Sequence, residues 1–302
     1  MGSNASIISG GVLIIFFLCA VLLCGCTGTE KASPAQFPSS EKPSQNTTAE
    51  ERVVGVLTIT GSTTVLPVAA QAAELYMDSH PGVDVQVNGG GSGVGVQAAG
   101  EGTAMIGMAS RDLKPEEREK YPELVEHQIA IDGIAIITHK TNPISSLTLE
   151  QVKSIYNGNI TNWREVGGAD AAIVVIGRDS ASGTREFFHE KVMNKEDFVQ
   201  NQLEKNSNGA VKQSVEQTPA AIGYVGLGYV DDTVHVVPIL VNGKPIVPSI
   251  ASVKDGSYPI ARPLNFLTNG EPSGIIADFI AFLSSPEGQK IVTEEGFVPL
   301  TH

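Results

Sequence analysis

Three times along the chain, a short apolar run rich in β-branched residues is followed by a polar turn and a helical pattern. In the first case, residues 53–60 predict a strand, and apolar positions over 66–77 recur at helical spacing. Pro67 fits the first helical turn, where its missing N–H costs no hydrogen bond. The hydroxyl residues 62–64 are therefore expected at the start of this helix.

The same order of strand, polar turn and helix occurs twice more. Residues 83–87 predict a strand, the glycine run 89–91 follows, and Ser92 opens a short helix. Residues 172–176 predict another strand, followed by a polar turn and a helix from about Gly183. Three turns of this kind place hydroxyl groups and unpaired backbone N–H groups at positive helix ends, a combination that favours anions.

Arg178 stands between the third strand and its turn. A single turn of this kind is usually an ordinary helix N-cap, because serine and threonine are preferred there. A guanidinium beside a buried strand, however, needs an anionic partner, and its fork of N–H groups suits a tetrahedral oxyanion. The sequence therefore predicts an anion site at this turn.

Further along, Thr148 and Gln151 match a capping box, which predicts a helix start. Trp163 is expected to pack within a structural loop. Two helices are expected near the C-terminus, at about 275–283 and 286–293.

Length and charge narrow the class of protein. The 302 residues, 41% of them hydrophobic, can bury a large core and are near the size at which a core divides into two lobes. The formal net charge of −13 argues against a nucleic-acid partner, because such binding depends on many basic side chains. A small anion needs only a few local donors.

The N-terminus is expected to be a targeting segment. Residues 7–23 form an apolar run of signal-peptide length, and Leu23-Cys24-Gly25-Cys26 resembles the lipobox of bacterial and archaeal lipoproteins. Cleavage after residue 25 would leave Cys26 lipidated, although residues 1–11 contain no Lys or Arg. If cleavage occurs, residues 26–53 would form the lipidated cysteine and a disordered spacer. The alternative is an uncleaved membrane helix at the N-terminus.

The sequence lacks the residues that other kinds of site require. All three cysteines lie within residues 19–26, and the six histidines form no close pair, so we expect no metal site and no cofactor. Residues 93–98, GVGVQA, match a permissive dinucleotide fingerprint, a weak signal in a chain with 32 glycines. A GxxxxGK[ST] phosphate loop and a GxSxG nucleophile motif are both missing from the sequence.

Several segments together resemble one known family. They are TGSTTVLPVA (60–69), NGGGSGVG (88–95), IGMASRDL (106–113), IDGIAII (131–137), TNWREVGG (161–168), GRDSASGTREFF (177–188), RPLNFLTNGEP (262–272) and SSPEGQKIV (284–292). From about residue 56 onward the chain is similar to the phosphate-binding lipoproteins of high-affinity phosphate ABC transporters. The resemblance implies an α/β, two-lobed periplasmic-binding-protein type 2 fold with two hinge crossings.

The resemblance also implies the domains and the site. Residues 1–25 would be the signal peptide, 54–138 plus 257–302 the first lobe, and 139–256 the second lobe. The phosphate-binding residues would be Ser62, Thr63, Thr64, Ser92, Ser110, Arg111, Asp132, Arg178, Ser182, Gly183 and Thr184. Asp179 is expected either to hold the Arg178 guanidinium or to be solvated.

One position departs from the family's best-known pattern. There, an aspartate accepts the proton that phosphate carries and sulfate lacks, but the matching residue here is Arg111, which has no acceptor. Asp132 and Asp112 are the two candidates for this role. We favour Asp132, which interrupts an apolar strand and needs a partner there, and we expect Arg111 to orient it or to add a second positive contact.

The implied function is binding of inorganic phosphate by a monomer, lipid-anchored at the extracytoplasmic face of the membrane, and delivery to an ABC permease. The protein is not expected to be an enzyme. Two alternatives remain: a binding protein for another oxyanion such as sulfate, molybdate or a phosphonate, and a secreted phosphohydrolase. The second would need a base or metal ligands beside Arg178.

Overall fold

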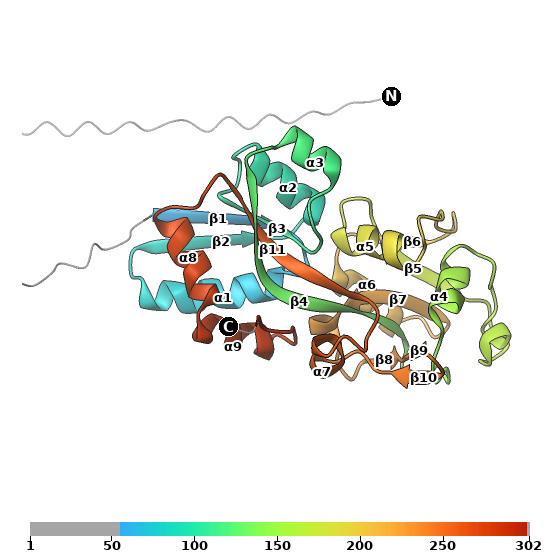
Figure 1. The fold of residues 1–302 in the computed structure, drawn as a ribbon. Coiled ribbons are helices and arrows are strands. Elements are labelled where there is room, and N and C mark those ends of the chain that lie inside the picture. The colour runs from blue at the N-terminus through green and yellow to red at the C-terminus, as the bar shows by residue number, and fades with distance from the viewer. Residues whose placement is uncertain (1–54, 301–302) are drawn as a thin grey trace, which may run out of the picture. The chain divides into compact units, whose positions relative to one another are not determined.

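Two long antiparallel strands, β4 (Leu124–His139) and β11 (Ala261–Asn269), form the middle of the main sheet in the computed structural model (Figure 1). The structure describes residues 55–300. The predicted signal peptide, the predicted lipidation site Cys26 and the predicted spacer lie outside these residues. No helix within the described range is long and apolar enough to cross a membrane.

The strands of the main sheet follow the order β2-β1-β3-β11-β4-β7-β5-β6, and β8 pairs separately with β4. Strands β1, β2 and β3 are mutually parallel, as are β5, β6 and β7, whereas β11 runs antiparallel to β3 and β4. The remaining strand bounds are β1 Gly55–Gly61, β2 Val83–Asn88, β3 Ile106–Ala109, β5 Val174–Arg178, β6 Leu203–Lys205, β7 Ala221–Gly226, β8 Val234–Val237, β9 Ile239–Val241 and β10 Lys244–Ile246.

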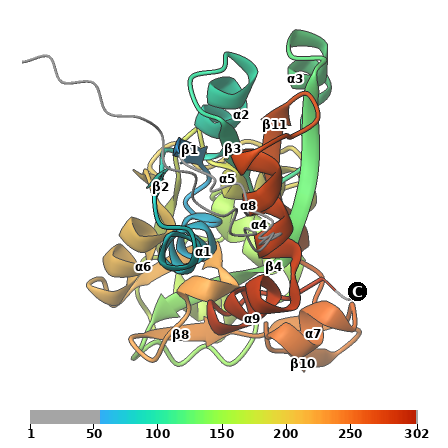
Figure 2. The same cartoon turned by 90° about the vertical axis from the view of Figure 1, so that its left-hand side faces the viewer.

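Helices cover both faces of this sheet. Their bounds are α1 Leu66–Ser79, α2 Ser92–Gly100, α3 Pro115–Lys120, α4 Leu149–Tyr156, α5 Gly183–Lys191, α6 Asn208–Glu216, α7 Ile250–Lys254, α8 Ile275–Ser284 and α9 Pro286–Glu294. Figure 2 shows α1, α8 and α9 close together, and their apolar side chains share one core. Helix α2 covers the other face of β3 and β11.

Separate hydrophobic clusters define the two lobes. In the first lobe, α1, α8 and α9 pack on β1, β2 and β3. In the second lobe, α4, α5 and α7 pack on one face of β5 and β7, and α6 packs on the other. Strand β4 changes from the first core at Ala130 to the second at Ile134, and β11 changes between Ala261 and Leu264. Both crossings between lobes therefore run through these two strands, while the residue boundaries expected from the sequence stay predictions.

The local predictions agree with the observed elements. Pro67 lies in the first turn of α1, and the Thr148–Gln151 capping box opens α4. Trp163 is buried in a short 3-10 turn, Trp163–Val166, and its Nε1 donates to the Ala220 carbonyl at 2.9 Å. Residues 93–98 form the body of α2, where Gly95 packs directly against the Met108 backbone, so its lack of a side chain serves helix–strand packing.

Candidate functional site

The three strand-to-helix turns meet between the two lobes. Thr64 Oγ1, before α1, lies 3.2 Å from Thr184 Oγ1 in the first turn of α5. Gly93 N, at the start of α2, donates to the Ala181 carbonyl at 3.0 Å. All three helices therefore direct their N-terminal ends toward the same region, although β1 and β5 are far apart in the sheet.

Two further segments complete this cluster. Ser110, which follows β3, places its Oγ 3.3 Å from Ser92 Oγ. Asn208, the first residue of α6, was not identified from the sequence. Its Nδ2 donates to Thr63 Oγ1 at 3.1 Å and to Thr64 Oγ1 at 3.0 Å, so α6 is a fourth helix that starts at this site.

Arg178 ends β5 directly beside the cluster, and only 1% of its surface is exposed. Its Nε donates to the Lys205 carbonyl at 3.1 Å and its Nη2 to the Asn206 carbonyl at 3.2 Å. Within residues 55–300, no carboxylate forms an ion pair with it. Burial lowers the pKa of the Arg178 guanidinium, because charge is costly to place in the interior without a counter-ion.

A second guanidinium, Arg262 of β11, lies on the other side of the cluster. Its Nε and Nη2 both donate to Asp132 Oδ2, at 2.9 and 2.7 Å, and both side chains are fully buried. The backbone N–H of Leu227 donates to Asp132 Oδ1 at 2.9 Å. Burial raises the pKa of Asp132 and lowers that of Arg262, and the ion pair opposes both shifts.

The nitrogen donors around the hydroxyl groups determine where the hydroxyl hydrogens can point. Thr64 Oγ1 accepts from Arg262 Nη2 at 3.1 Å and from Asn208 Nδ2 at 3.0 Å. Since a hydroxyl oxygen has two lone pairs, both are occupied and the hydrogen is left to donate toward Thr184. Arg262 Nη1 similarly donates to Ser110 Oγ at 3.2 Å.

The first turns of the helices add backbone donors. Ser182 caps α5 by accepting from Arg185 N, which leaves the N–H groups of Gly183 and Thr184 without partners inside the helix. These N–H groups, the directed hydroxyls and Arg178 all donate hydrogen bonds. The arrangement is suited to a small ligand that only or mainly accepts hydrogen bonds, such as an oxyanion.

Arg111 does not have the role expected of it. Its Nη1 and Nη2 bind the two oxygens of Glu117 at 2.7 and 2.8 Å, and its Nε donates to Glu186 of α5. The prediction that Arg111 orients Asp132 is therefore wrong, because Arg262 occupies that position. The alternative, a second positive contact from Arg111 to the ligand, stays a prediction. Burial alone would lower the pKa of Arg111, but the hydrogen bonds and charges of the two glutamates outweigh it and raise this pKa.

The three acidic residues considered from the sequence lie in different surroundings. Asp112 is exposed, whereas Asp132 is fully buried. Asp179 makes no ion pair with Arg178 within the described part of the chain, and its Oδ1 is buried without a hydrogen-bond partner there. The expectation that Asp179 holds the guanidinium therefore does not fit this geometry, since backbone carbonyls hold it instead.

The residues that the sequence reasoning missed carry recognisable signals. Arg262 interrupts an apolar stretch, as Asp132 does, and the same argument that demanded a partner for Asp132 applies to Arg262. Ser207-Asn208 precedes a helical pattern and matches a helix start. Neither signal shows which side chains meet, because the contacts join residues 130 and 144 positions apart.

Gly183→Ala is expected to weaken ligand binding by at least tenfold, about 1.4 kcal/mol. A Cβ at this position would lie 2.2 Å from Ser92 Oγ and 3.1 Å from Ser110 Oγ, so α5 could not approach both serines. Gly209→Ala in α6 is the matched control, because a Cβ there would meet only Tyr229, at 4.0 Å. Equal ligand affinity in both variants, measured by calorimetry, would contradict a close approach at Gly183.

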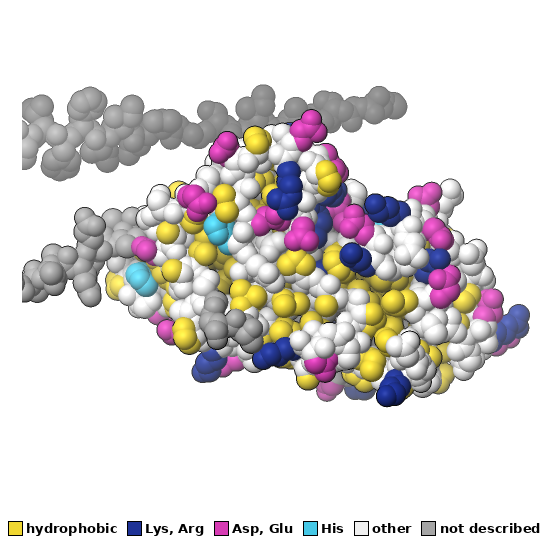
Figure 3. All heavy atoms as spheres, in the orientation of Figure 1, with side chains coloured by type: hydrophobic (Ala, Val, Ile, Leu, Met, Phe, Trp, Pro, Cys, Tyr) yellow, Lys and Arg dark blue, Asp and Glu magenta, His cyan; other side chains and the backbone are white. Residues whose placement is uncertain are grey.

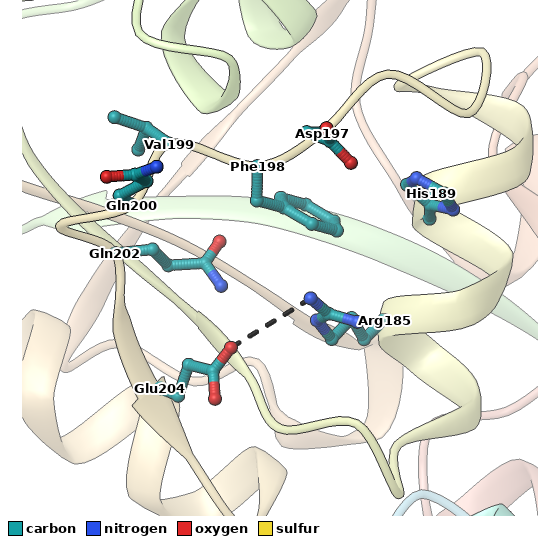
Figure 4. A pocket seen from close by; sticks show the side chains of 8 residues that line it. All are labelled: Arg185, His189, Asp197, Phe198, Val199, Gln200, Gln202 and Glu204. Carbon is teal, nitrogen blue, oxygen red and sulfur yellow. Dashed lines mark ion pairs between the residues drawn. The ribbon is translucent and has the colours of Figure 1, made fainter.

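A cavity of about 710 Å³ lies elsewhere on the second lobe, between α5 and residues 197–204. Figure 4 shows Arg185 of α5 turned toward Glu204 of β6, with the Phe198 ring above it and His189 further along α5. Arg185 Nη2 lies 3.9 Å from Glu204 Oε1 and its guanidinium stacks on Phe198. This cation therefore already has a carboxylate, and the cavity lacks the unpaired positive charge found at Arg178.

Fold and site together define a two-lobed binding protein of the α/β class. A family model described as "PBP superfamily domain" matches residues 46–287. The phosphate-binding protein PstS of Bacillus subtilis is 33% identical over 293 residues, which cover 96% of this chain and 93% of that protein. The chain belongs to the PBP superfamily and, within it, to the PstS family of phosphate-binding proteins.

Solved structures agree with this placement. One is a Clostridium perfringens protein assigned as a phosphate ABC transporter substrate-binding protein, with bound phosphate. It is 42% identical, has a TM-score of 0.76, and is matched over 82% of this chain and 100% of its own. An ABC-type phosphate transport receptor from Vibrio cholerae is 33% identical with a TM-score of 0.67, matched over 82% of this chain and 100% of its own.

Proposed function

We propose that this protein binds inorganic phosphate with high affinity between its two lobes and delivers it to the permease of an ABC transporter. The observation that carries the proposal is Arg178, a buried guanidinium that has only backbone carbonyls as partners within residues 55–300. A doubly charged oxyanion would supply the missing negative charge. The names of the relatives point to the same ligand.

The roles of the site residues follow from their donors. Arg178 would bind two phosphate oxygens through its guanidinium, and the N–H groups at the start of α5 would bind another. Ser110, and Thr64 in place of its contact with Thr184, would donate their hydroxyl hydrogens to phosphate, because Arg262 keeps these hydrogens directed away from itself. Asp132 would accept the phosphate proton, since its Oδ1 receives one hydrogen bond and keeps further acceptor capacity.

The position in the cell is part of the same proposal. Cys26 would carry a lipid that anchors the protein, as a monomer, at the extracytoplasmic face of the membrane. A spacer from residue 27 onward would allow the folded part to reach the permease. Mass measurement of the protein isolated from membranes would test the anchor, since lipidation at Cys26 removes the first 25 residues and adds acyl mass.

Calorimetry of the full chain against phosphate, sulfate, molybdate and a phosphonate is the decisive test of function. We expect phosphate to bind at least a hundredfold more tightly than sulfate, a difference of about 2.7 kcal/mol. Tightest binding of another oxyanion would establish the first alternative. Turnover of a phosphomonoester above background would instead favour a phosphohydrolase, although the described residues contain no group of three side chains able to hold a metal ion.

A further inference from the structure

The most concentrated set of charges between the lobes lies outside the proposed phosphate site. It consists of Arg111, Lys114, Glu117 and Glu186, which we call the cross-lobe cluster. Figure 3 shows side chains of both signs intermixed over α3 and α5. The cluster adjoins a cavity of about 230 Å³ between residues 111–115 and α5.

One half of the cluster is fixed within the first lobe. Glu117 binds Arg111 through both oxygens, at 2.7 and 2.8 Å, and also accepts from the backbone N–H of Lys114 at 2.9 Å. The Arg111 side chain is only 7% exposed. Burial raises the pKa of Glu117, but hydrogen bonds from Arg111 and Lys114 outweigh burial and lower this pKa overall, so the pair remains ionised. Arg111 is thus preorganised by Glu117, and Lys114 provides a second cation beside it.

The other half is a single residue of the second lobe. Glu186 of α5 contacts Arg111 Nε with one oxygen and Lys114 Nζ with the other. It lies two residues beyond Thr184, whose Oγ1 contacts Thr64. Because α5 moves as one helix, any opening that separates Thr184 from Thr64 also pulls Glu186 away from both cations.

We infer that Glu186 is an electrostatic latch that holds the closed lobes together and so sets how slowly the ligand leaves. This inference rests on the proposed phosphate function but concerns closure and release, since none of the cluster is needed to contact phosphate. Glu186 is a positioning residue that acts through α5. An ion pair formed only after closure slows dissociation and has little effect on association.

The direction in which phosphate binding changes when the Glu186 charge is removed distinguishes a latch from simple repulsion between Glu186 and the anion. Removing a negative charge near an anion site should strengthen phosphate binding, because repulsion falls. The latch predicts the opposite for Glu186→Gln: phosphate dissociation about three- to tenfold faster, with association nearly unchanged. Glu190→Gln is the matched control, being exposed, one helical turn further along α5 and free of ion pairs within residues 55–300.

Stopped-flow release of phosphate from the full chain would measure these rates at low and high salt. As the salt concentration rises, the phosphate affinity of wild type and of Glu190→Gln should fall more steeply than that of Glu186→Gln. The reason is that salt screens the ion pairs of Glu186, which Glu186→Gln no longer has. Lys114→Gln should speed release by itself but add little in the double variant with Glu186→Gln. Unchanged or slower release in Glu186→Gln would overturn the latch.

Small-angle scattering of the ligand-free protein tests the latch independently of the proposed function. Ligand-free Glu186→Gln should have a larger radius of gyration than ligand-free Glu190→Gln, because fewer molecules are closed. If wild type failed to bind phosphate, the proposed function would fall while this comparison still tested the latch. Equal radii in the two variants would overturn it, whatever the ligand.

Discussion

Arg178→Ala is expected to weaken phosphate binding by about 3–5 kcal/mol, the cost of removing one partner from a buried charged pair. The guanidinium is buried at the end of β5, and within residues 55–300 its only partners are the backbone carbonyls of Lys205 and Asn206. Without Arg178, the phosphate charge would be desolvated beside Arg262 alone, whose charge is already paired with Asp132. Calorimetry with phosphate would measure the loss.

The same variant should behave differently without ligand. A buried cation that lacks a counter-ion costs free energy, so its removal is expected to leave the ligand-free melting temperature unchanged or raised. Arg178→Lys should recover only part of the affinity, since a lysine lacks the planar fork. Arg185→Ala, which removes an arginine already close to Glu204, is the control and should bind normally. Near-native affinity in Arg178→Ala would exclude this residue from the site.

The elements that build the site could be predicted because their signals are local. The strand, turn and helix around Arg178 lie within about twenty residues, and β5 and α5 were found close to their expected positions. The glycine run before Ser92 and the proline after Thr64 act equally locally, through backbone conformation. Short-range backbone preferences therefore account for all three turns. The turns face the same site because each follows the carboxyl end of a strand.

The partners of the buried charges could not be predicted, because they depend on register across the sheet. Arg262 meets Asp132 since β11 and β4 pair with these two residues directly opposite each other. Arg111, only one residue from Ser110, was an equally reasonable partner on sequence grounds. In the structure, Arg111 instead contacts Glu117 of α3 and Glu186 of α5. Sequence pattern showed that Asp132 needs a cation without showing which one.

Asp132→Asn is expected to reduce the preference for phosphate over sulfate by about 1.5–3 kcal/mol, the contribution of a hydrogen bond to a charged group. Sulfate has no proton to donate at neutral pH. A sulfate oxygen and the Asp132 carboxylate would therefore face each other as two acceptors with no hydrogen between them. An asparagine can turn its NH₂ group toward either anion and removes this penalty for sulfate. Competition titrations of both anions would measure the change.

A control must separate this selectivity from stability. Asp132→Asn also leaves Arg262 without its carboxylate, which should cost about 3–5 kcal/mol of unfolding free energy. Asp132→Asn combined with Arg262→Met removes both charges, so stability should largely return while the preference for phosphate stays reduced. Asp112→Asn changes an exposed carboxylate and should alter neither property. Lost selectivity in Asp112→Asn alone would transfer the role to that residue, and an unchanged preference in every variant would exclude proton recognition by a carboxylate.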